Sequence, residues 1–240
     1  MTARRFASEG ASVVLAARTA EALNEVAGKI EADGGRALAV PSDVGDAATI
    51  EGLVVRAVDT FGRLDVAFNN AAGGGQPPTR IPDLPVESFD SAVATTLRSV
   101  FLCLKYEIPA MLQTGGGAIV NTSSTAGIEA VGGLAGYVAS KHGVIGLTKT
   151  AALEYADQGI RVNAVAPGPI LTENLNRAPA EARQKAAMSM PMRRVGQPDE
   201  VADVVLWLAS DAASFVTGIT VPIEGGKLAG MAPFAGMGKA

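Results

Sequence analysis

The chain has 240 residues, 48% of them apolar, a net charge of −4 and a pI near 5.1. An acidic chain without clustered Lys and Arg lacks the basic surface that nucleic acids require. No apolar stretch reaches the roughly 20 residues of a membrane-spanning helix. The charged start MTARRFASEG has no apolar signal core, and the one cysteine, Cys103, excludes an internal disulfide. We therefore expect a cytoplasmic protein that binds neither nucleic acid nor membrane.

Short runs rich in β-branched residues alternate with longer helical patterns along the chain. In chain order, strands are expected at 12–16, 36–40, 64–68, 118–121, 161–165 and 220–223. Helices are expected at 3–9, 20–33, 47–61, 86–113, 136–158 and 198–209. This alternation predicts βαβ units, and thus an α/β fold with one doubly wound parallel sheet. Without a repeat or a linker, residues 1–240 are interpreted as one domain.

The segment Tyr-Val-Ala-Ser-Lys at 137–141 places Tyr137 and Lys141 four residues apart, on one face of an expected helix. A tyrosine with a pKa of about 10 exchanges its proton poorly at neutral pH, and a neighbouring ammonium lowers that pKa. The pair therefore suits a reaction in which Tyr137 is the general acid or base and Lys141 tunes it. Alone, the spacing is not specific, because it occurs by chance on many helices.

Ser124 follows the strand expected at 118–121 and precedes Tyr137 by 13 residues. Ligands of α/β sheets bind at the carboxyl ends of the strands, where the Ser124 hydroxyl would hydrogen-bond a substrate oxygen. The alternative is a serine that caps a turn or a helix. The presence of Tyr137 and Lys141 favours the first interpretation.

The set Ser124, Tyr137 and Lys141 resembles the catalytic set of the classical short-chain dehydrogenases/reductases. Further segments resemble motifs of that family in the same order: Ser42-Asp43-Val44, Leu-Asp-Val-Ala-Phe-Asn-Asn-Ala at 64–71, Pro-Gly-Pro-Ile-Leu-Thr at 167–172, and Gly225-Gly226. In the second of these, Ala72 intervenes before Gly73 of the family's Asn-Asn-Ala-Gly pattern. The resemblance covers residues 3–226. It implies a Rossmann-like fold, hydride transfer between a nicotinamide cofactor and a ketone or secondary alcohol, and a homo-oligomer, either a tetramer or a dimer.

The resemblance also implies a role for each matching residue. Ser124 would orient the carbonyl, Tyr137 would transfer the proton, and Lys141 would lower the Tyr137 pKa and hold the nicotinamide ribose. Other cofactor contacts would come from Asp43 and Val44 at the adenine, Asn70 at its ribose, and Pro167, Gly168, Ile170 and Thr172 in the loop around the carboxamide. Asn69 is interpreted as a turn residue and His142 as structural. No metal site is expected.

Two departures from the family pattern affect these expectations. The family's fourth catalytic residue, an Asn, corresponds here to Thr96, which puts the proton relay in doubt more than hydride transfer. The family's opening strand and TGxxxGxG turn, which cradle the pyrophosphate, have no counterpart, because the match begins inside the following helix. We therefore expect a gap in the sheet between the family's second and fourth strands, and interpret Met1 as an internal methionine.

The cofactor preference is read from the end of the strand expected at 12–16. Family members that prefer NAD usually carry an acid at the position of Ala17, whereas here an apolar residue precedes Arg18. The resemblance thus favours NADP(H) over NAD(H), with Arg18 pairing the 2′-phosphate. The alternative is a solvated loop arginine.

The segment 173–196 corresponds to the family's mobile substrate loop, and residues 227–240 form a tail at the surface or at a subunit contact. Met188, Met190 and Met192 either line an apolar pocket or pack, and packing is favoured slightly. The substrate stays open beyond a small carbonyl or alcohol. Two functions remain: an active oxidoreductase, or a non-catalytic relative that has lost cofactor binding together with the Gly-rich turn.

Overall fold

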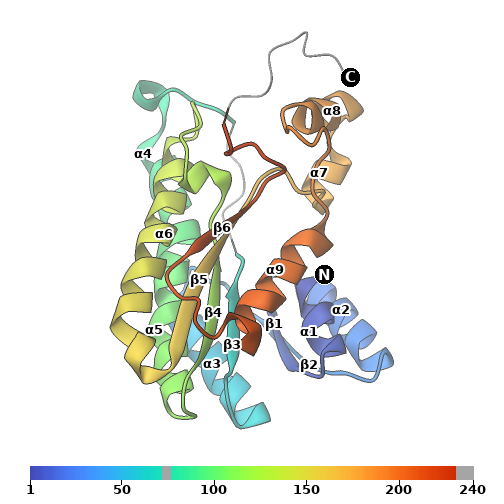
Figure 1. Cartoon of the computed structure of the whole chain (residues 1–240), viewed down its shortest axis with the longest axis vertical. Helices are drawn as coiled ribbons and strands as arrows, with labels where there is room; N and C mark the ends of the chain where they lie inside the picture. Colours follow the sequence, from blue (N-terminus) through green and yellow to red (C-terminus); the bar gives the residue numbers. More distant parts are fainter. Residues whose placement is uncertain (72–76, 231–240) are drawn as a thin grey trace.

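The computed structural model describes residues 1–71 and 77–230. In this part of the chain, strands and helices alternate as expected (Figure 1). The strands are β1 Ser12–Ala17, β2 Arg36–Pro41, β3 Val66–Asn69, β4 Gly117–Thr122, β5 Ile160–Pro167 and β6 Thr220–Ile223. All of the pairs between neighbouring strands are parallel, which confirms the α/β class.

The helices agree with the expected positions, apart from residues 86–113 and two further helices, α7 and α8, in the segment expected to be a loop. They are α1 Thr2–Ser8, α2 Ala20–Ala32, α3 Ala47–Phe61, α4 Val86–Ala92, α5 Ser99–Leu112, α6 Ala135–Tyr155, α7 Glu173–Arg177, α8 Ala180–Met188 and α9 Pro198–Ala209. The helix expected at 86–113 is helical throughout residues 86–112, but it contains a π-helical segment, Val93–Arg98, between α4 and α5. There the Thr95 hydroxyl donates to the Ser91 carbonyl at 2.7 Å and the Ser99 hydroxyl to the Thr95 carbonyl at 2.8 Å. Such bonds compete with the regular helical ladder.

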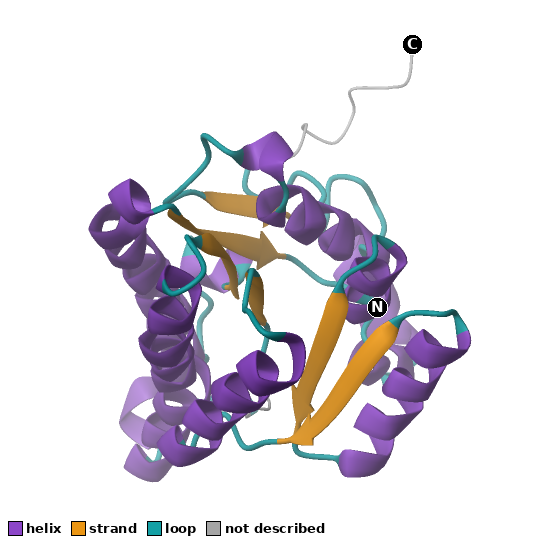
Figure 2. Ribbon diagram, turned by 90° about the horizontal axis from the view of Figure 1, so that it is seen from below, coloured by secondary structure: helices purple, strands orange, loops and turns teal. Residues whose placement is uncertain are grey.

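The strands form two sheets, β1-β2 and β3-β4-β5-β6. Figure 2 shows β1 and β2 as a pair apart from the other strands. No backbone pairing joins β1 to β3 in the described residues, and this is where the resemblance predicts a gap. Side chains connect the two parts instead. Phe6 of α1 and Phe68 of β3 pack against the same buried cluster beneath α9, and Arg5 pairs with Asp203 of α9.

The four-stranded sheet has helices on both faces, since successive side chains of a strand point to opposite sides. One face packs against α5 and α6 through a cluster that includes Ile119 and Val162. The other face packs against α9, where Val120 and Val165 contact Val205 and Leu208. The carboxyl ends of all the strands are therefore left at one edge, between the helical layers. This doubly wound arrangement positions the site.

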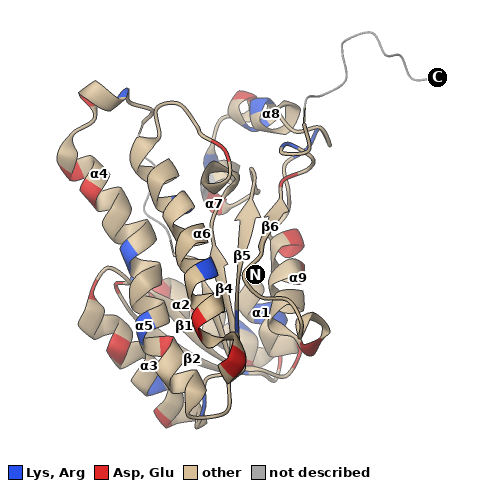
Figure 3. Cartoon of the chain, turned by 60° about the vertical axis from the view of Figure 1, so that its left-hand side comes forward, with Lys and Arg blue, Asp and Glu red and all other residues tan. Residues whose placement is uncertain are grey.

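Helix α9 is fixed at both ends by charged side chains. At its start, Glu200 forms a capping box with Gln197 and pairs with both terminal nitrogens of Arg194 at 2.8 and 2.6 Å. These bonds lower the pKa of Glu200 to about 2. At its end, the Arg161 guanidinium of β5 donates to the Leu208 carbonyl at 2.6 Å. Elsewhere, acidic and basic side chains are interspersed along the helices (Figure 3).

Candidate active site

Lys141 lies on the buried face of α6 and is only 1% exposed. Its Nζ donates a hydrogen bond of 2.6 Å to the main-chain carbonyl of Thr122, the last residue of β4. Burial disfavours the charged amine and lowers the pKa of Lys141 to about 8. The ammonium is thus held at the carboxyl end of the sheet by a strand carbonyl.

Tyr137 lies one turn before Lys141 on α6 and is half-buried. The Nζ of Lys141 is 5.7 Å from the centre of the Tyr137 ring, which is within the range of a cation–π contact. The structure therefore brings this predicted pair together.

Ser124 is the second residue after β4, at the carboxyl edge of the sheet. Its Oγ accepts a hydrogen bond of 3.2 Å from the Ala126 amide and caps the short 3-10 helix Thr125–Gly127. Ser124 therefore does act as a capping serine, as in the alternative interpretation of the sequence. A serine hydroxyl that accepts one bond still has a proton to donate, so capping and substrate binding are compatible.

Ser123 is a site residue that the sequence reasoning missed. It is buried, and its Oγ donates to the main-chain carbonyl of Lys141 at 2.9 Å. A Cβ atom on Gly127 would come within 2.7 Å of the same carbonyl, so only glycine fits there. The Ser-Ser-Thr-Ala-Gly run from 123 to 127 was the available signal, because small residues allow a strand end to approach a helix closely.

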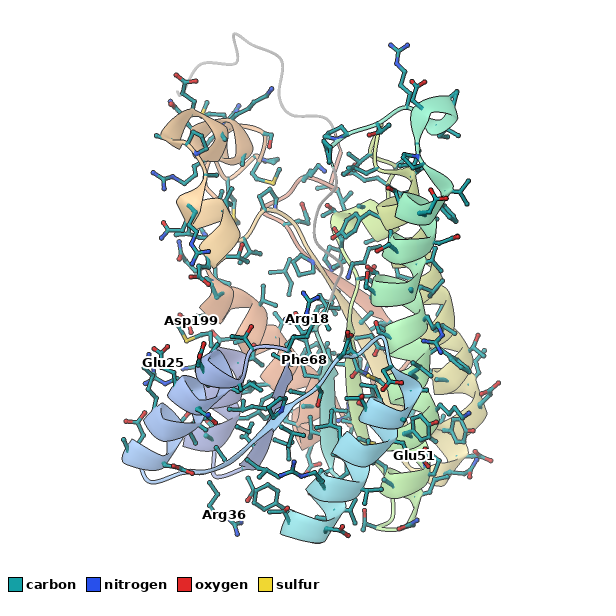
Figure 4. All side chains as sticks on the ribbon, turned by 180° about the vertical axis from the view of Figure 1, so that it is seen from behind. Arg18, Glu25, Arg36, Glu51, Phe68 and Asp199 are labelled. Carbon is teal, nitrogen blue, oxygen red and sulfur yellow. The ribbon has the colours of Figure 1, made fainter. Side chains whose placement is uncertain are left out.

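The residues predicted to hold the adenosine half lie after β1, β2 and β3. Arg18 is exposed and follows β1; Figure 4 shows it between the two sheets, near Phe68. Asp43 accepts a hydrogen bond of 2.9 Å from the Gly45 amide, and Val44 packs beside α3 and α5. Asn70 accepts a bond of 3.1 Å from the Thr122 hydroxyl. These residues share the strand-end edge, while Ala72 and Gly73 lie outside the described residues.

The loop after β5 holds the remaining predicted contacts. Pro167 ends the strand, the Gly168 amide donates to the Ile223 carbonyl at 3.0 Å, and Ile170 forms an isolated parallel bridge with Gly196. Thr172 caps the start of α7. The loop is thus anchored to β6 and to the residues that precede α9.

The substrate segment 173–196 contains α7 and α8 rather than an irregular loop. Met190 is buried, whereas Met188 and Met192 are 52% and 64% exposed. Of the three methionines, only Met190 is therefore a packing residue. Met190 and Met192 border a shallow pocket with Pro169 and Gly225.

Thr96 occupies the position that the resemblance gives to an Asn. It lies in the π-helical segment and is 1% exposed. Next to it, Arg98 donates to the Gly45 carbonyl at 2.6 Å, so this segment also supports the loop after β2.

The interpretation of Asn69 as a turn residue is wrong. Asn69 ends β3 with a buried side chain, whose Nδ2 donates to Glu107 and to the Asn121 Oδ1, each at 3.0 Å. Asn121 in turn donates to the Thr148 Oγ1 at 3.0 Å. Burial raises the pKa of Glu107 to about 7, although the hydrogen bond from Asn69 lowers it in part. An Asn inside the apolar strand Ala-Ile-Val-Asn was the one sequence signal of this network.

His142 is exposed, and its Nδ1 lies 2.9 Å from the Val138 carbonyl. Across residues 1–71 and 77–230, no three or more His, Cys, Asp or Glu side chains are grouped as a metal site would need. Within the same residues, no helix combines the length and apolar character needed to cross a bilayer. Of the tail from 227 to 240, only residues up to 230 are described; Lys227 pairs there with Glu129.

The chain is similar along most of its length to known dehydrogenases and reductases. Residues 1–227 match the family model described as enoyl-(acyl carrier protein) reductase. Cyclohexanol dehydrogenase of Acinetobacter sp. (strain SE19) is 44% identical over 225 residues, or 93% of this chain and 88% of that protein. The A-factor type gamma-butyrolactone 1′-reductase (1S-forming) of Streptomyces virginiae is 45% identical over 226 residues, or 92% and 87%.

Solved structures agree with this similarity. Levodione reductase superposes with a TM-score of 0.91 at 38% identity, over 96% of this chain and 93% of that one. A 7α-hydroxysteroid dehydrogenase complexed with NADH and 7-oxo glycochenodeoxycholic acid gives 0.88 at 35% identity, over 94% and 88%. The chain therefore belongs to the short-chain dehydrogenase/reductase family of oxidoreductases.

Proposed function

We propose that this protein interconverts a secondary alcohol and a ketone, with Tyr137 as general acid and base. The observation that carries the proposal is the buried Lys141 amine, 5.7 Å from the Tyr137 ring centre and bonded to the end of β4. Burying an amine costs free energy unless the fold compensates for it. Such a costly group beside a phenol, at the ligand-binding edge of a parallel sheet, is expected of a catalytic site.

The residues divide the work as follows. Ser124 donates its hydroxyl proton to the substrate oxygen and so orients it. Tyr137 gives its proton to that oxygen during reduction and takes it back during oxidation. Lys141 stabilises the phenolate that is left. The nicotinamide cofactor, when bound, supplies or accepts the hydride.

We propose NADP(H) as the preferred cofactor. Arg18 is exposed after β1, where its guanidinium can pair with a 2′-phosphate in a forked geometry, and Ala17 offers no carboxylate to a ribose hydroxyl. Asp43, Val44 and Asn70 would hold the adenosine half. Lys141 and the loop of Pro167, Gly168, Ile170 and Thr172 would hold the nicotinamide half.

We propose a cyclic secondary alcohol or ketone as substrate. The relatives named above include a cyclohexanol dehydrogenase and a levodione reductase, and another, 41% identical over 228 residues, is a cis-4-hydroxycyclohexanecarboxylate dehydrogenase of Sinomonas cyclohexanicum. Exposed Met192 and buried Met190 give the pocket near the β5 loop one apolar, adaptable side, while Arg194, Glu200 and Glu224 also line it. The apolar side is compatible with a ring of carbon atoms.

A second candidate is a family member that does not bind the cofactor. The facing edges of β1 and β3 are unpaired in the described residues, so no strand pairing joins the two parts that would have to hold the two halves of the cofactor. Titration of the folded chain with NADPH and NADH in a calorimeter separates the two candidates, because only the first predicts binding below millimolar cofactor.

We also propose that the protein is a homo-oligomer. Leu153 of α6, Trp207 of α9 and Phe215 are large apolar side chains exposed at the surface, and Phe215 is fully exposed. Exposed aromatic side chains are typical of subunit contacts. Light scattering of the wild type and of Phe215→Ser tests this, since a monomeric wild type excludes it.

The catalytic proposal is tested by reduction of cyclohexanone and oxidation of cyclohexanol with both cofactors. Tyr137→Phe should lower kcat about 10²–10⁴-fold and leave NADPH binding in place. Tyr106→Phe on α5 is the matched control, and its kcat should stay within about twofold of wild type. An active Tyr137→Phe protein would refute the assignment.

A further inference from the structure

Asn121 and Thr122 of β4, together with Ser123 directly after the strand, hold helix α6 at Lys141 and at Thr148. Asn121 donates from its Nδ2 to the Thr148 Oγ1 at 3.0 Å, the Thr122 carbonyl accepts from Lys141 Nζ at 2.6 Å, and Ser123 donates to the Lys141 carbonyl at 2.9 Å. Lys141 and Thr148 are two helical turns apart, and both are at most 1% exposed. The polar contacts of α6 with β4 therefore extend well beyond the reacting groups.

The side chain of Asn121 is also bonded to the neighbouring strand, β3. Its Oδ1 accepts one proton of the Asn69 amide at 3.0 Å, and the other acceptor near that Nδ2 is Glu107 of α5, also at 3.0 Å. At the far end, the Thr148 hydroxyl donates to the Val144 carbonyl at 2.8 Å. Donation starts at Asn69, which gives one proton to Glu107 and the other to Asn121; Asn121 donates in turn to Thr148, and Thr148 to the Val144 carbonyl. We call these four side chains, Glu107, Asn69, Asn121 and Thr148, the buried amide chain.

The buried amide chain has a single end on each helix. Glu107 receives one hydrogen bond and gives none in the described contacts, so it is the terminal acceptor on α5. A carboxyl keeps an acceptor oxygen whether it is ionised or protonated. Thr148 is the end on α6. All four side chains are buried, where an unmet donor is costly, so each bond constrains the next.

We propose that the buried amide chain is a positioning device that sets α6 against β4 and so holds the Lys141 amine beneath Tyr137. Glu107 and Thr148 touch no reacting atom; they act through Asn121 and the helix. Leucine or valine at these positions would fill the same space without specifying one alignment. The kinetic consequence rests on the proposed function, but the placement of Lys141 does not.

The pKa of Lys141 is a readout of this placement that requires no catalysis. It can be measured by NMR in protein with ¹⁵Nζ-labelled lysine, with Lys141→Met to assign the signal. Thr148→Val removes the hydroxyl at nearly constant volume, and Thr148→Ser restores it. Glu107→Leu removes the terminal acceptor, whereas Glu107→Gln keeps an acceptor oxygen for Asn69. Thr150→Val, at an exposed position of α6, is the matched control.

Glu107→Leu and Thr148→Val should each raise the Lys141 pKa by about 0.5–1 unit toward its ordinary value, because a loosened helix admits water. Glu107→Gln, Thr148→Ser and Thr150→Val should leave it within about 0.3 unit of wild type. The double variant Glu107→Leu/Thr148→Val should shift the pKa no further than the larger single change, since both break one chain. In an active enzyme, kcat should fall in the same two single variants with a smaller change in KM.

The proposal is overturned if Glu107→Leu and Thr148→Val lower the melting temperature but leave the Lys141 pKa at the Thr150→Val value. Additive shifts in the double variant also overturn it. Should Glu107→Leu fail to fold, the difference between Thr148→Val and Thr148→Ser decides alone. A wild type without dehydrogenase activity would refute the proposed function and leave the NMR result to judge the buried amide chain.

Discussion

The Nζ atom of Lys141 and the ring of Tyr137 lie 5.7 Å apart, in a setting that leaves Lys141 only 1% exposed. Burial lowers the pKa of Lys141 from its ordinary 10.5 to about 8, so between these values the folded state binds fewer protons than the unfolded state. The free energy of unfolding should therefore rise as pH increases from about 8 to 10.5, by up to about 3 kcal/mol. Urea unfolding across that range measures it.

Lys141→Met is the control for this pH dependence. It removes the titrating amine at similar side-chain length, so its unfolding free energy should lack the rise that the wild type shows. Equal slopes in both proteins would mean that Lys141 is not buried as described. The same variant should lose most of the proposed activity, because the phenolate of Tyr137 loses its neighbouring cation.

For Glu107 we expect the free energy of unfolding to depend on pH with the opposite sign, and at lower pH. Burial raises its pKa to about 7 from 4.5, so the folded state holds an additional proton between those values. The free energy of unfolding should fall as pH rises from about 4.5 to 7, by up to about 3 kcal/mol. Glu107→Gln cannot ionise, and the difference between its unfolding curve and that of the wild type should change across this window alone. A constant difference would contradict the prediction.

Gly127 predicts a steric effect on the site. A Cβ atom there would lie 2.7 Å from the Lys141 carbonyl, so Gly127→Ala must push α6 away from the end of β4. We expect a loss of about 1–3 kcal/mol in unfolding free energy and a lower kcat. Gly132→Ala, where no atom lies within 4 Å of the added carbon, should change neither quantity. Similar values for the two variants would show that the contact at Gly127 relaxes without cost.

Arg18 predicts a change in cofactor preference. Arg18→Ala removes the guanidinium offered to the 2′-phosphate, so the KM for NADPH should rise about 10-fold or more. The KM for NADH, which has no 2′-phosphate, should change by less than about threefold. Steady-state kinetics with both cofactors decides. An equal rise for both would assign Arg18 to a general structural role.

The sequence predicts the parallel sheet well, because its strands are short, apolar and bounded by turns, and the central strands β4 and β5 are buried on both faces. The pairing of Tyr137 with Lys141 also follows from helical spacing alone. The π-helical segment Val93–Arg98 does not, since its residues fit an ordinary helical pattern and the deviation comes from hydroxyl contacts one turn away.

The buried amide chain was missed for a related reason. Glu107 in Lys-Tyr-Glu-Ile-Pro reads as a solvated helix residue, and Asn69 next to Asn70 reads as a turn. Both become buried only when β3, β4 and α5 converge, so their partners lie 38 and 52 residues away along the chain. Local patterns carry no information at that separation.

The separation of β1-β2 from the four-stranded sheet has a thermodynamic consequence. Leu15, Leu23 and Ile30 form a cluster of their own, linked to the rest by side-chain packing rather than strand pairing, through Phe6 and the Arg5–Asp203 pair among others. The lobe formed by α1, β1, α2 and β2 can therefore open at a lower free energy than global unfolding. Its amides should exchange hydrogen before those of β4 and β5. Arg18 and Asp43 stand on the lobe, while Tyr137 and Lys141 stand on the larger body. A dinucleotide that binds both parts would stabilise the lobe against opening. Its binding should therefore slow hydrogen exchange in β1.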